Sequence, residues 1–261
     1  MEHIDKIKRA TVALVLLKES EEGHPFTIVG SGYCIHERGV VVTCSHVLSM
    51  FMKEPWEQSL ARAKKGEYDQ PEGFHIDTLV PYVLFFVNHS REELLGILVR
   101  PSIAMAKMTH DIGMLRLQPH RGFPQGFPSV EIAAYSAVRE GAEIGVCGFP
   151  LGNYLQKQIG TVNSSFSKGI ISSIIPSSGV VLDYLQGFQL NVFATHGSSG
   201  GPVFLYETGK VLGAIESDVV DREGKRIDGL VKAAPIYPLL ENDSVERMLQ
   251  AQPGQPATVK R

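Results

Sequence analysis

Short apolar or alternating segments recur along this 261-residue chain, and turn-forming residues separate them. Each segment has the length of one β-strand, and glycine, proline or asparagine bounds many of them. Many short strands with few helical patterns favour an all-β fold, and the length allows one large or two small domains. The predicted strands are residues 11–17, 26–35, 40–43, 80–87, 96–99, 112–117, 143–148, 169–175, 180–182, 187–191, 202–205, 211–215 and 230–233.

Residues 197–202, with the sequence GSSGGP, are the most informative about function. Glycine lacks a Cβ atom and adopts positive φ, which lets the backbone N–H groups of Gly197 and Ser199 converge beside the Ser199 hydroxyl. Two such donors would form an oxyanion hole, and the segment resembles the loop that carries the nucleophile in trypsin-like serine proteases, in which Ser199 would be that nucleophile. Because Gly/Ser clusters are most often plain turns, this segment alone does not establish catalysis.

Two other segments resemble the partners that such a nucleophile needs. Residues 43–46 (TCSH) end an apolar run and resemble the strand end that presents a general base, His46. Residues 110–115 (HDIGML) resemble the segment that supplies an orienting carboxylate, Asp111. The chain order histidine, aspartate, serine is the order in trypsin-like serine proteases of the chymotrypsin type, and it differs from the subtilisin and α/β-hydrolase orders. Each residue alone has an ordinary structural explanation, but the three together point to one architecture.

Further segments are similar to the HtrA/Deg-like branch of this family. Residues 30–35 (GSGYCI) resemble its Gly-Ser-Gly hairpin before the base. Residues 145–152 (GVCGFPLG) resemble its Gly-Tyr/Asn-Pro-Leu-Gly turn, and residues 167–172 (SKGIIS) its Thr-Xaa-Gly-Ile-Val-Ser strand. The resemblance extends from about Thr11 to about Pro235.

The resemblance implies an all-β protease domain over residues 1–250, made of two packed six-stranded antiparallel β-barrels at about 1–125 and 126–235. The site would lie in the cleft between them. Periodicity predicts a helical insertion at residues 49–65, either a surface helix or a docking element for a regulatory partner. It also predicts a C-terminal helix from Asp243 or Ser244 to Gln250, followed by a disordered tail at 251–261.

The resemblance implies a serine endopeptidase that hydrolyses protein or peptide substrates through an acyl-enzyme intermediate. His46 would act as general base and acid, Asp111 would fix its tautomer, and the Gly197 and Ser199 N–H groups would stabilise the oxyanion. In trypsin-like zymogens a freed amino terminus pairs with an aspartate just before the nucleophile, and that residue here is Ser198. We therefore expect activity without such processing, or control by loop ordering. A pseudo-protease that binds peptides by strand addition and an esterase remain alternatives.

The family pattern puts the floor of the pocket for the substrate residue before the cut bond (P1) at Phe193, beside Ala194, with residues 216–218 and 230–232 as walls. Since Phe193 offers no carboxylate, apolar P1 residues are favoured, unless Glu216 or Asp218 points inward and selects a basic one. His110 and His196 are expected at the polar rim. The predicted substrate-binding residues are Phe193, Ala194, His196, Glu216, Ser217, Asp218 and Leu230.

Composition limits the remaining functions. A net charge of −3 gives no basic footprint for nucleic acid, and no apolar segment predicts a signal peptide or a membrane span. The nine histidines and three cysteines show no metal-ligand spacing, so neither a metal nor another cofactor is expected. The register expected for Cys34, opposite Val42, disfavours a disulfide with Cys44, and this favours a reducing, cytoplasmic location.

Overall fold

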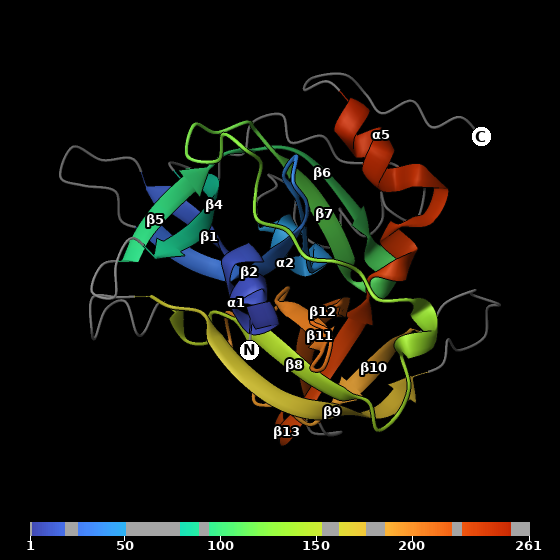
Figure 1. Ribbon diagram of the computed structural model, residues 1–261. Helices are drawn as coiled ribbons and strands as arrows, with labels where there is room; N and C mark the ends of the chain where they lie inside the picture. The colour runs from blue at the N-terminus through green and yellow to red at the C-terminus, as the bar shows by residue number, and fades with distance from the viewer. Residues whose placement is uncertain are drawn as a thin grey trace.

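The computed structural model of the chain describes residues 2–18, 26–50, 79–88, 94–152, 162–175, 186–220 and 226–251. This part contains thirteen strands and few helices, in agreement with the predicted all-β class (Figure 1). The helices are α1 (Glu2–Ala10), α2 (Ser45–Ser49) and α5 (Ser244–Gln250), with short 3-10 turns at Met108–His110, Tyr135–Ala137, Tyr237–Leu239 and Glu241–Asp243. The strands are β1 (Thr11–Lys18), β2 (Phe26–His36), β3 (Val40–Thr43), β4 (Leu79–Asn88), β5 (Leu94–Val99), β6 (Pro101–Lys107), β7 (Ile112–Leu117), β8 (Glu143–Gly148), β9 (Ser165–Ile175), β10 (Gly187–Leu190), β11 (Pro202–Leu205), β12 (Val211–Val220) and β13 (Arg226–Pro235).

The first seven strands form one antiparallel sheet, in the order β5-β4-β1-β2-β3-β7-β6. Its edge strands β5 and β6 are consecutive in the chain and are joined by Arg100 alone, so the sheet curls until its two edges meet at that residue. The sequence predicts six strands in this sheet, and the structure adds β6. Pro101 opens β6, which is a position where a proline costs no ladder hydrogen bond.

The last six strands form a closed antiparallel barrel, in the order β10-β13-β12-β11-β8-β9. It fills the lower half of the view in Figure 1, below the curled sheet. This barrel matches the six-stranded barrel that the sequence predicted. The strand predicted at residues 180–182 lies outside the described residues.

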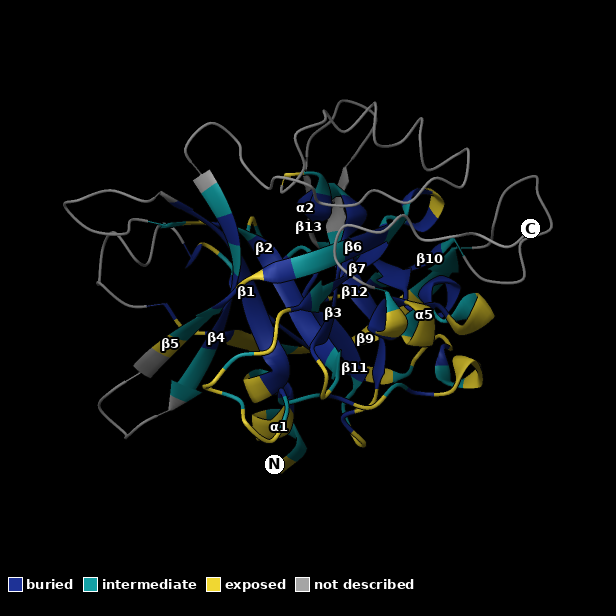
Figure 2. Cartoon of the chain, turned by 90° about the horizontal axis from the view of Figure 1, so that it is seen from above, coloured by how far each residue is buried: buried dark blue, intermediate teal, exposed yellow. Residues whose placement is uncertain are grey.

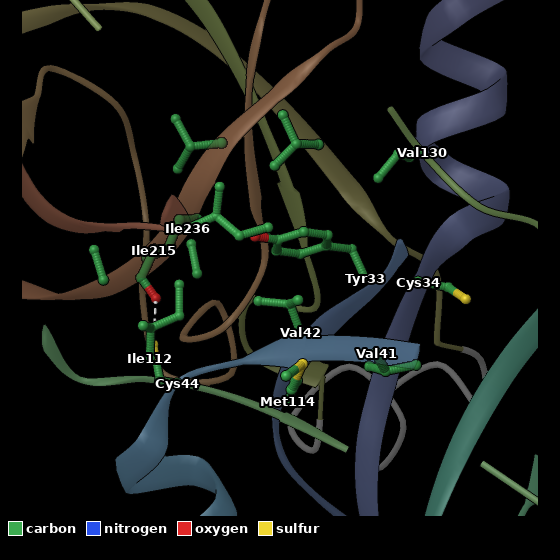
Figure 3. Packing of buried hydrophobic residues seen from close by; sticks show 14 of the residues in the cluster. Tyr33, Cys34, Val41, Val42, Cys44, Ile112, Met114, Val130, Ile215 and Ile236 are labelled. Atoms are coloured by element: carbon green, nitrogen blue, oxygen red, sulfur yellow. Dashed lines mark hydrogen bonds between the residues drawn. The ribbon is translucent and has the colours of Figure 1, made fainter. Parts of the chain in front are cut away.

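One hydrophobic core extends through both sheets. Figure 3 shows Tyr33 and Val42 of the first sheet packed with Ile215 of the barrel and with Ile236, and all four are fully or almost fully buried. Dark blue, buried strands fill the centre of the molecule in Figure 2. Each such side chain contributes about 1.5–3 kcal/mol through its burial. The shared core therefore fixes how the two sheets face each other, and with it the geometry of their junction.

Helix α1 was not predicted from the sequence, and only two of its residues, Ile7 and Ala10, are buried. Acidic residues in its first turn and basic residues in its last turn match the helix dipole. The Thr11 hydroxyl donates to the Ile7 carbonyl at 2.8 Å, which joins α1 to β1.

Helix α5 confirms the predicted C-terminal helix, and Arg116 of β7 donates to the carbonyl of Met248 at 3.2 Å. The predicted insertion is described only as far as residue 50, so its remainder lies outside the described residues, as does the tail from residue 252. Within the described ranges, no helix is long and apolar enough to cross a membrane.

Candidate active site

His46 lies where the first sheet ends. Strand β3 ends at Thr43, and α2 begins at Ser45, so His46 projects from the first turn after the strand. Two buried hydroxyls hold this turn: Thr43 Oγ1 donates to the Ser31 carbonyl at 2.7 Å, and Ser45 Oγ donates to the Ile112 carbonyl at 2.8 Å. The His46 side chain is half-buried, at 31% exposure.

Asp111 contacts His46 at two points. Its Oδ2 lies 2.6 Å from His46 Nδ1, and its Oδ1 accepts the His46 backbone N–H at 3.0 Å. A carboxylate only accepts hydrogen bonds, so Nδ1 carries the hydrogen and the Nδ1–H group donates a hydrogen bond to Oδ2. Asp111 has φ 48° and ψ 40°, in the left-handed region where aspartate is better tolerated than most residues. The arrangement fixes both the tautomer and the orientation of the ring.

The loop at residues 197–201 joins both sheets at this point. The Ile215 carbonyl of β12 accepts the Gly200 N–H at 2.7 Å and the Cys44 thiol at 3.0 Å, and Figure 3 shows the second of these bonds. Gly200 has φ +87°, and a Cβ there would collide with the Ser31 carbonyl and the Thr43 hydroxyl. The loop thus packs directly against the strand end that carries the histidine, with half-buried Ser199 at its tip.

The N–H groups of Gly197 and Ser199 have no hydrogen-bond partner among the described residues. The preceding carbonyls are held away from them: the His196 carbonyl accepts the Leu151 N–H at 2.9 Å, and the Ser198 carbonyl accepts the Gly201 N–H at 2.9 Å. In a trans peptide the C=O and the next N–H point in opposite directions. Both N–H groups are therefore available to an outside acceptor, as an oxyanion hole requires.

Ser198 satisfies its own polar groups within the loop. It is buried, its N–H donates to the Thr195 carbonyl at 2.9 Å, and its hydroxyl accepts the Thr195 N–H at 3.2 Å. This residue closes a local turn and carries no charge for an amino terminus to meet.

Glu216 and Lys232 form an ion pair between the predicted pocket walls, with Glu216 Oε1 2.7 Å from Lys232 Nζ. The Glu216 side chain is 12% exposed, and its Oε2 has no partner among the described residues. Burial raises the pKa of the Glu216 carboxyl and outweighs the opposing effect of Lys232, while the negative charge of Asp111 adds to the rise. Lys232 therefore balances the charge of the Glu216 carboxylate when both groups are ionised.

The other predicted pocket residues differ in how far their side chains are buried. Ala194 is buried and Leu230 half-buried, but Phe193 is 65% exposed and His196 is exposed. A side chain so open to solvent does not have the burial of a pocket floor. Strand β12 contains Ser217 and Asp218, whose side chains lie outside the described part of the structure.

His110 was expected at the rim, and this expectation is wrong, because the residue is only 7% exposed. Its Nδ1 lies 3.1 Å from Thr109 Oγ1, and its Nε2 has no partner among the described residues. Burial lowers the pKa of the imidazole, with Lys107 and Lys232 adding to the effect and Glu241 opposing it.

Cys44 lies beside His46 and Asp111, and the possible metal-ligand atoms of the three residues lie within 4.8 Å of one another. Burial raises the pKa of the Cys44 thiol well above its ordinary value, and the thiol donates to Ile215. These contacts suit a protonated thiol and a histidine committed to Asp111. The chain's cysteines are free and buried, and a bulge in β2 sets Cys34 opposite Val41, one residue from the expected register.

A family model described as the trypsin-like peptidase domain matches residues 30–213, a span that includes His46, Asp111 and Ser199. The chain belongs to the trypsin-like peptidase family. This agrees with the resemblance found in the sequence motifs. The comparison with curated protein sequences gives no match.

Solved structures of HtrA-type proteases share the fold of this peptidase chain. The HtrA-type protease AlgW, in a structure with a decapeptide, is 15% identical with a TM-score of 0.60, over 94% of this chain and 67% of that chain. A variant of AlgW with a tripeptide is 15% identical with a TM-score of 0.58, over 96% of this chain and 64% of that chain. This peptidase chain thus spans about two thirds of the length of each.

Proposed function

We propose that this protein is a serine endopeptidase in which Ser199 is the nucleophile, His46 the general base and Asp111 the orienting carboxylate. The observation that carries the proposal is the two-point contact of Asp111 with the His46 Nδ1 and backbone N–H groups. It sets the tautomer that a base acting through Nε2 requires.

The reaction follows from this geometry. His46 Nε2 takes the Ser199 hydroxyl proton while Oγ attacks the peptide carbonyl carbon, and the carbonyl oxygen becomes an oxyanion held by the N–H groups of Gly197 and Ser199. The C–N bond then breaks, and His46 returns the proton to the leaving amine. Water then attacks the carbonyl carbon of the acyl-enzyme while His46 removes a proton from the water. The bond between this carbon and Ser199 Oγ breaks, and His46 returns the proton to Oγ.

Peptides are the substrates that the proposal favours, because the structurally similar HtrA-type protease is known with bound peptides. Among the described residues of the predicted P1 pocket, the one carboxylate, that of Glu216, is already paired with Lys232. Small and medium apolar P1 residues, such as alanine, valine and leucine, are therefore favoured. Peptide binding without cleavage is the alternative that the test below distinguishes.

The test is cleavage of a mixed peptide library, with products sequenced by mass spectrometry. We expect cleavage by the wild-type protein and none by Ser199→Ala, whereas Ser198→Ala, which changes the neighbouring hydroxyl, should retain activity. A folded wild-type protein that binds peptides and leaves them intact would contradict the proposal. Cleavage mainly after lysine or arginine would contradict only the apolar P1 preference.

A further inference from the structure

Ser31 makes several hydrogen bonds next to the site. It lies on β2 between Gly30 and Gly32 and is completely buried. Its backbone N–H donates to the Ser199 carbonyl at 2.7 Å, and its hydroxyl donates to the Gly197 carbonyl at 2.5 Å. One residue of the first sheet thus binds the carbonyl groups of both predicted oxyanion-hole residues.

The hydroxyl of Ser31 also accepts a hydrogen bond, from the Phe149 N–H at 2.9 Å. Phe149 begins the turn that carries Leu151, whose N–H holds the His196 carbonyl at 2.9 Å. The Ser31 hydroxyl therefore binds the Gly197–Ser198 peptide group directly. It also supports the turn that holds the His196–Gly197 peptide group. In the sequence Ser31 belongs to the hairpin motif at residues 30–35, which by itself predicts no role for its hydroxyl.

These contacts fix the peptide planes on both sides of Gly197. The plane before it is held through the His196 carbonyl, and the plane after it through the Gly197 carbonyl. Gly197 has φ +93°, and a Cβ there would collide with the Phe149 carbonyl, so only glycine fits. Glycine has no conformational preference strong enough to hold this geometry by itself, and the direction of its N–H depends on the two anchors.

We propose that Ser31 is a positioning residue of the oxyanion hole: its hydroxyl holds the Gly197 carbonyl and the Phe149 turn so that the Gly197 N–H points at the substrate carbonyl oxygen. The inference rests on the proposed protease function. Ser31 does not touch the substrate. It acts on the transition state, where the oxyanion forms, far more than on substrate binding.

A purely structural role for Ser31 predicts something different. Loss of a buried hydroxyl leaves polar groups unpaired, which lowers stability wherever it occurs. Thr11 provides the matched case, because it lies on β1 of the same sheet and away from the loop. Its buried hydroxyl also donates to a backbone carbonyl, that of Ile7 in α1. A purely structural effect would lower the melting temperature in either variant and leave kcat per folded molecule unchanged in both.

The test compares Ser31→Ala with Thr11→Val, measuring kcat and KM on a cleaved peptide and the inactivation rate by a fluorophosphonate. Concentrations are corrected for folded protein by near-UV circular dichroism. We expect Ser31→Ala to lower kcat and the inactivation rate by roughly 10- to 100-fold, and to change KM by no more than about threefold. This loss is smaller than the roughly 10²- to 10³-fold loss that follows removal of an oxyanion-hole donor itself. Thr11→Val should keep the wild-type kcat. Ser31→Cys, which keeps a weak donor, should fall between wild type and Ser31→Ala, and it replaces Ser31→Ala if that variant does not fold.

Each outcome separates this inference from the proposed function. An active wild-type protein with unchanged kcat in Ser31→Ala, or in Ser31→Cys where that variant replaces it, overturns the positioning role and leaves the protease assignment intact. A rise in KM with constant kcat overturns it as well. A folded wild-type protein with neither cleavage nor inactivation overturns both.

Discussion

Replacing Asp111 by asparagine tests how the two-point contact with His46 works. The carboxylate accepts two hydrogen bonds, from the His46 Nδ1–H at 2.6 Å and from its backbone N–H at 3.0 Å. An amide offers only one acceptor oxygen. In Asp111→Asn, either the NH₂ group faces Nδ1 and selects the tautomer with Nε2 protonated, or it faces the backbone N–H as a second donor. The first arrangement leaves Nε2 protonated and unable to act as a base. The second sets the amide NH₂ group against the His46 backbone N–H, so that two hydrogen-bond donors face each other.

We expect Asp111→Asn to lower kcat/KM for peptide cleavage by about 10⁴-fold, the effect that a wrong tautomer has in a serine-histidine-aspartate triad, or about 5.4 kcal/mol of transition-state stabilisation. The fold should survive, because asparagine tolerates the left-handed conformation of residue 111 as aspartate does. Steady-state kinetics and thermal melting measure the two effects separately.

Glu131→Gln serves as the control for Asp111→Asn, since it makes the same change from carboxylate to amide on an exposed residue whose partners, Lys6 and Lys210, are also exposed. It should change neither kcat/KM nor the melting temperature measurably. A loss of less than about tenfold in Asp111→Asn, with the control unchanged, would refute the tautomer argument.

Three further predictions concern the surroundings of the site. Gly200→Ala should lower the melting temperature and abolish cleavage, because φ is +87° and the new Cβ would collide with a backbone oxygen and a threonine hydroxyl; wild-type melting would contradict this packing. Burial raises the pKa of the Cys34 and Cys147 thiols to about 12, so iodoacetamide should modify them only on unfolding. Because the cysteines are free, reductant should not change the melting temperature. Rapid labelling of the native protein would contradict the burial of these thiols. Burial also raises the pKa of the Glu216 carboxyl above 4.5, so the folded state holds its proton to higher pH than the unfolded chain, and this group lowers stability as pH rises through that interval. The melting temperature of Glu216→Gln relative to wild type should therefore increase from about pH 4.5 upward, and a pH-independent difference would contradict the assignment.

Strand segments were predictable from the sequence because side-chain alternation and turn residues are local signals. Strand β6 was missed, since the chain bends at Arg100 and pairs on the opposite edge of the sheet, which no local pattern reveals. Helix α1 was missed because its nine residues are fewer than the roughly 11 to 18 over which helical periodicity is normally recognised. Only the pairing of β6 depends on tertiary contacts alone.

The site was predictable to the same extent. The contact between His46 and Asp111 connects motifs that could be recognised separately, and the positive φ of Gly197 follows from a glycine in a tight loop. The bond from the Ser31 hydroxyl to the Gly197 carbonyl spans 166 positions, and the sequence carries no signal for it. The exposure of Phe193 depends on how its loop packs, which a family pattern at a single position does not determine.

The central claim is that Ser199 is a nucleophile activated by His46. The most direct measurement is reaction of the folded protein with a fluorophosphonate, followed by intact mass and peptide mapping. We expect one adduct per chain, located on Ser199, retained in Ser198→Ala and absent in both Ser199→Ala and His46→Ala. An adduct on Ser198, or a folded wild-type protein that gains no mass, would contradict it.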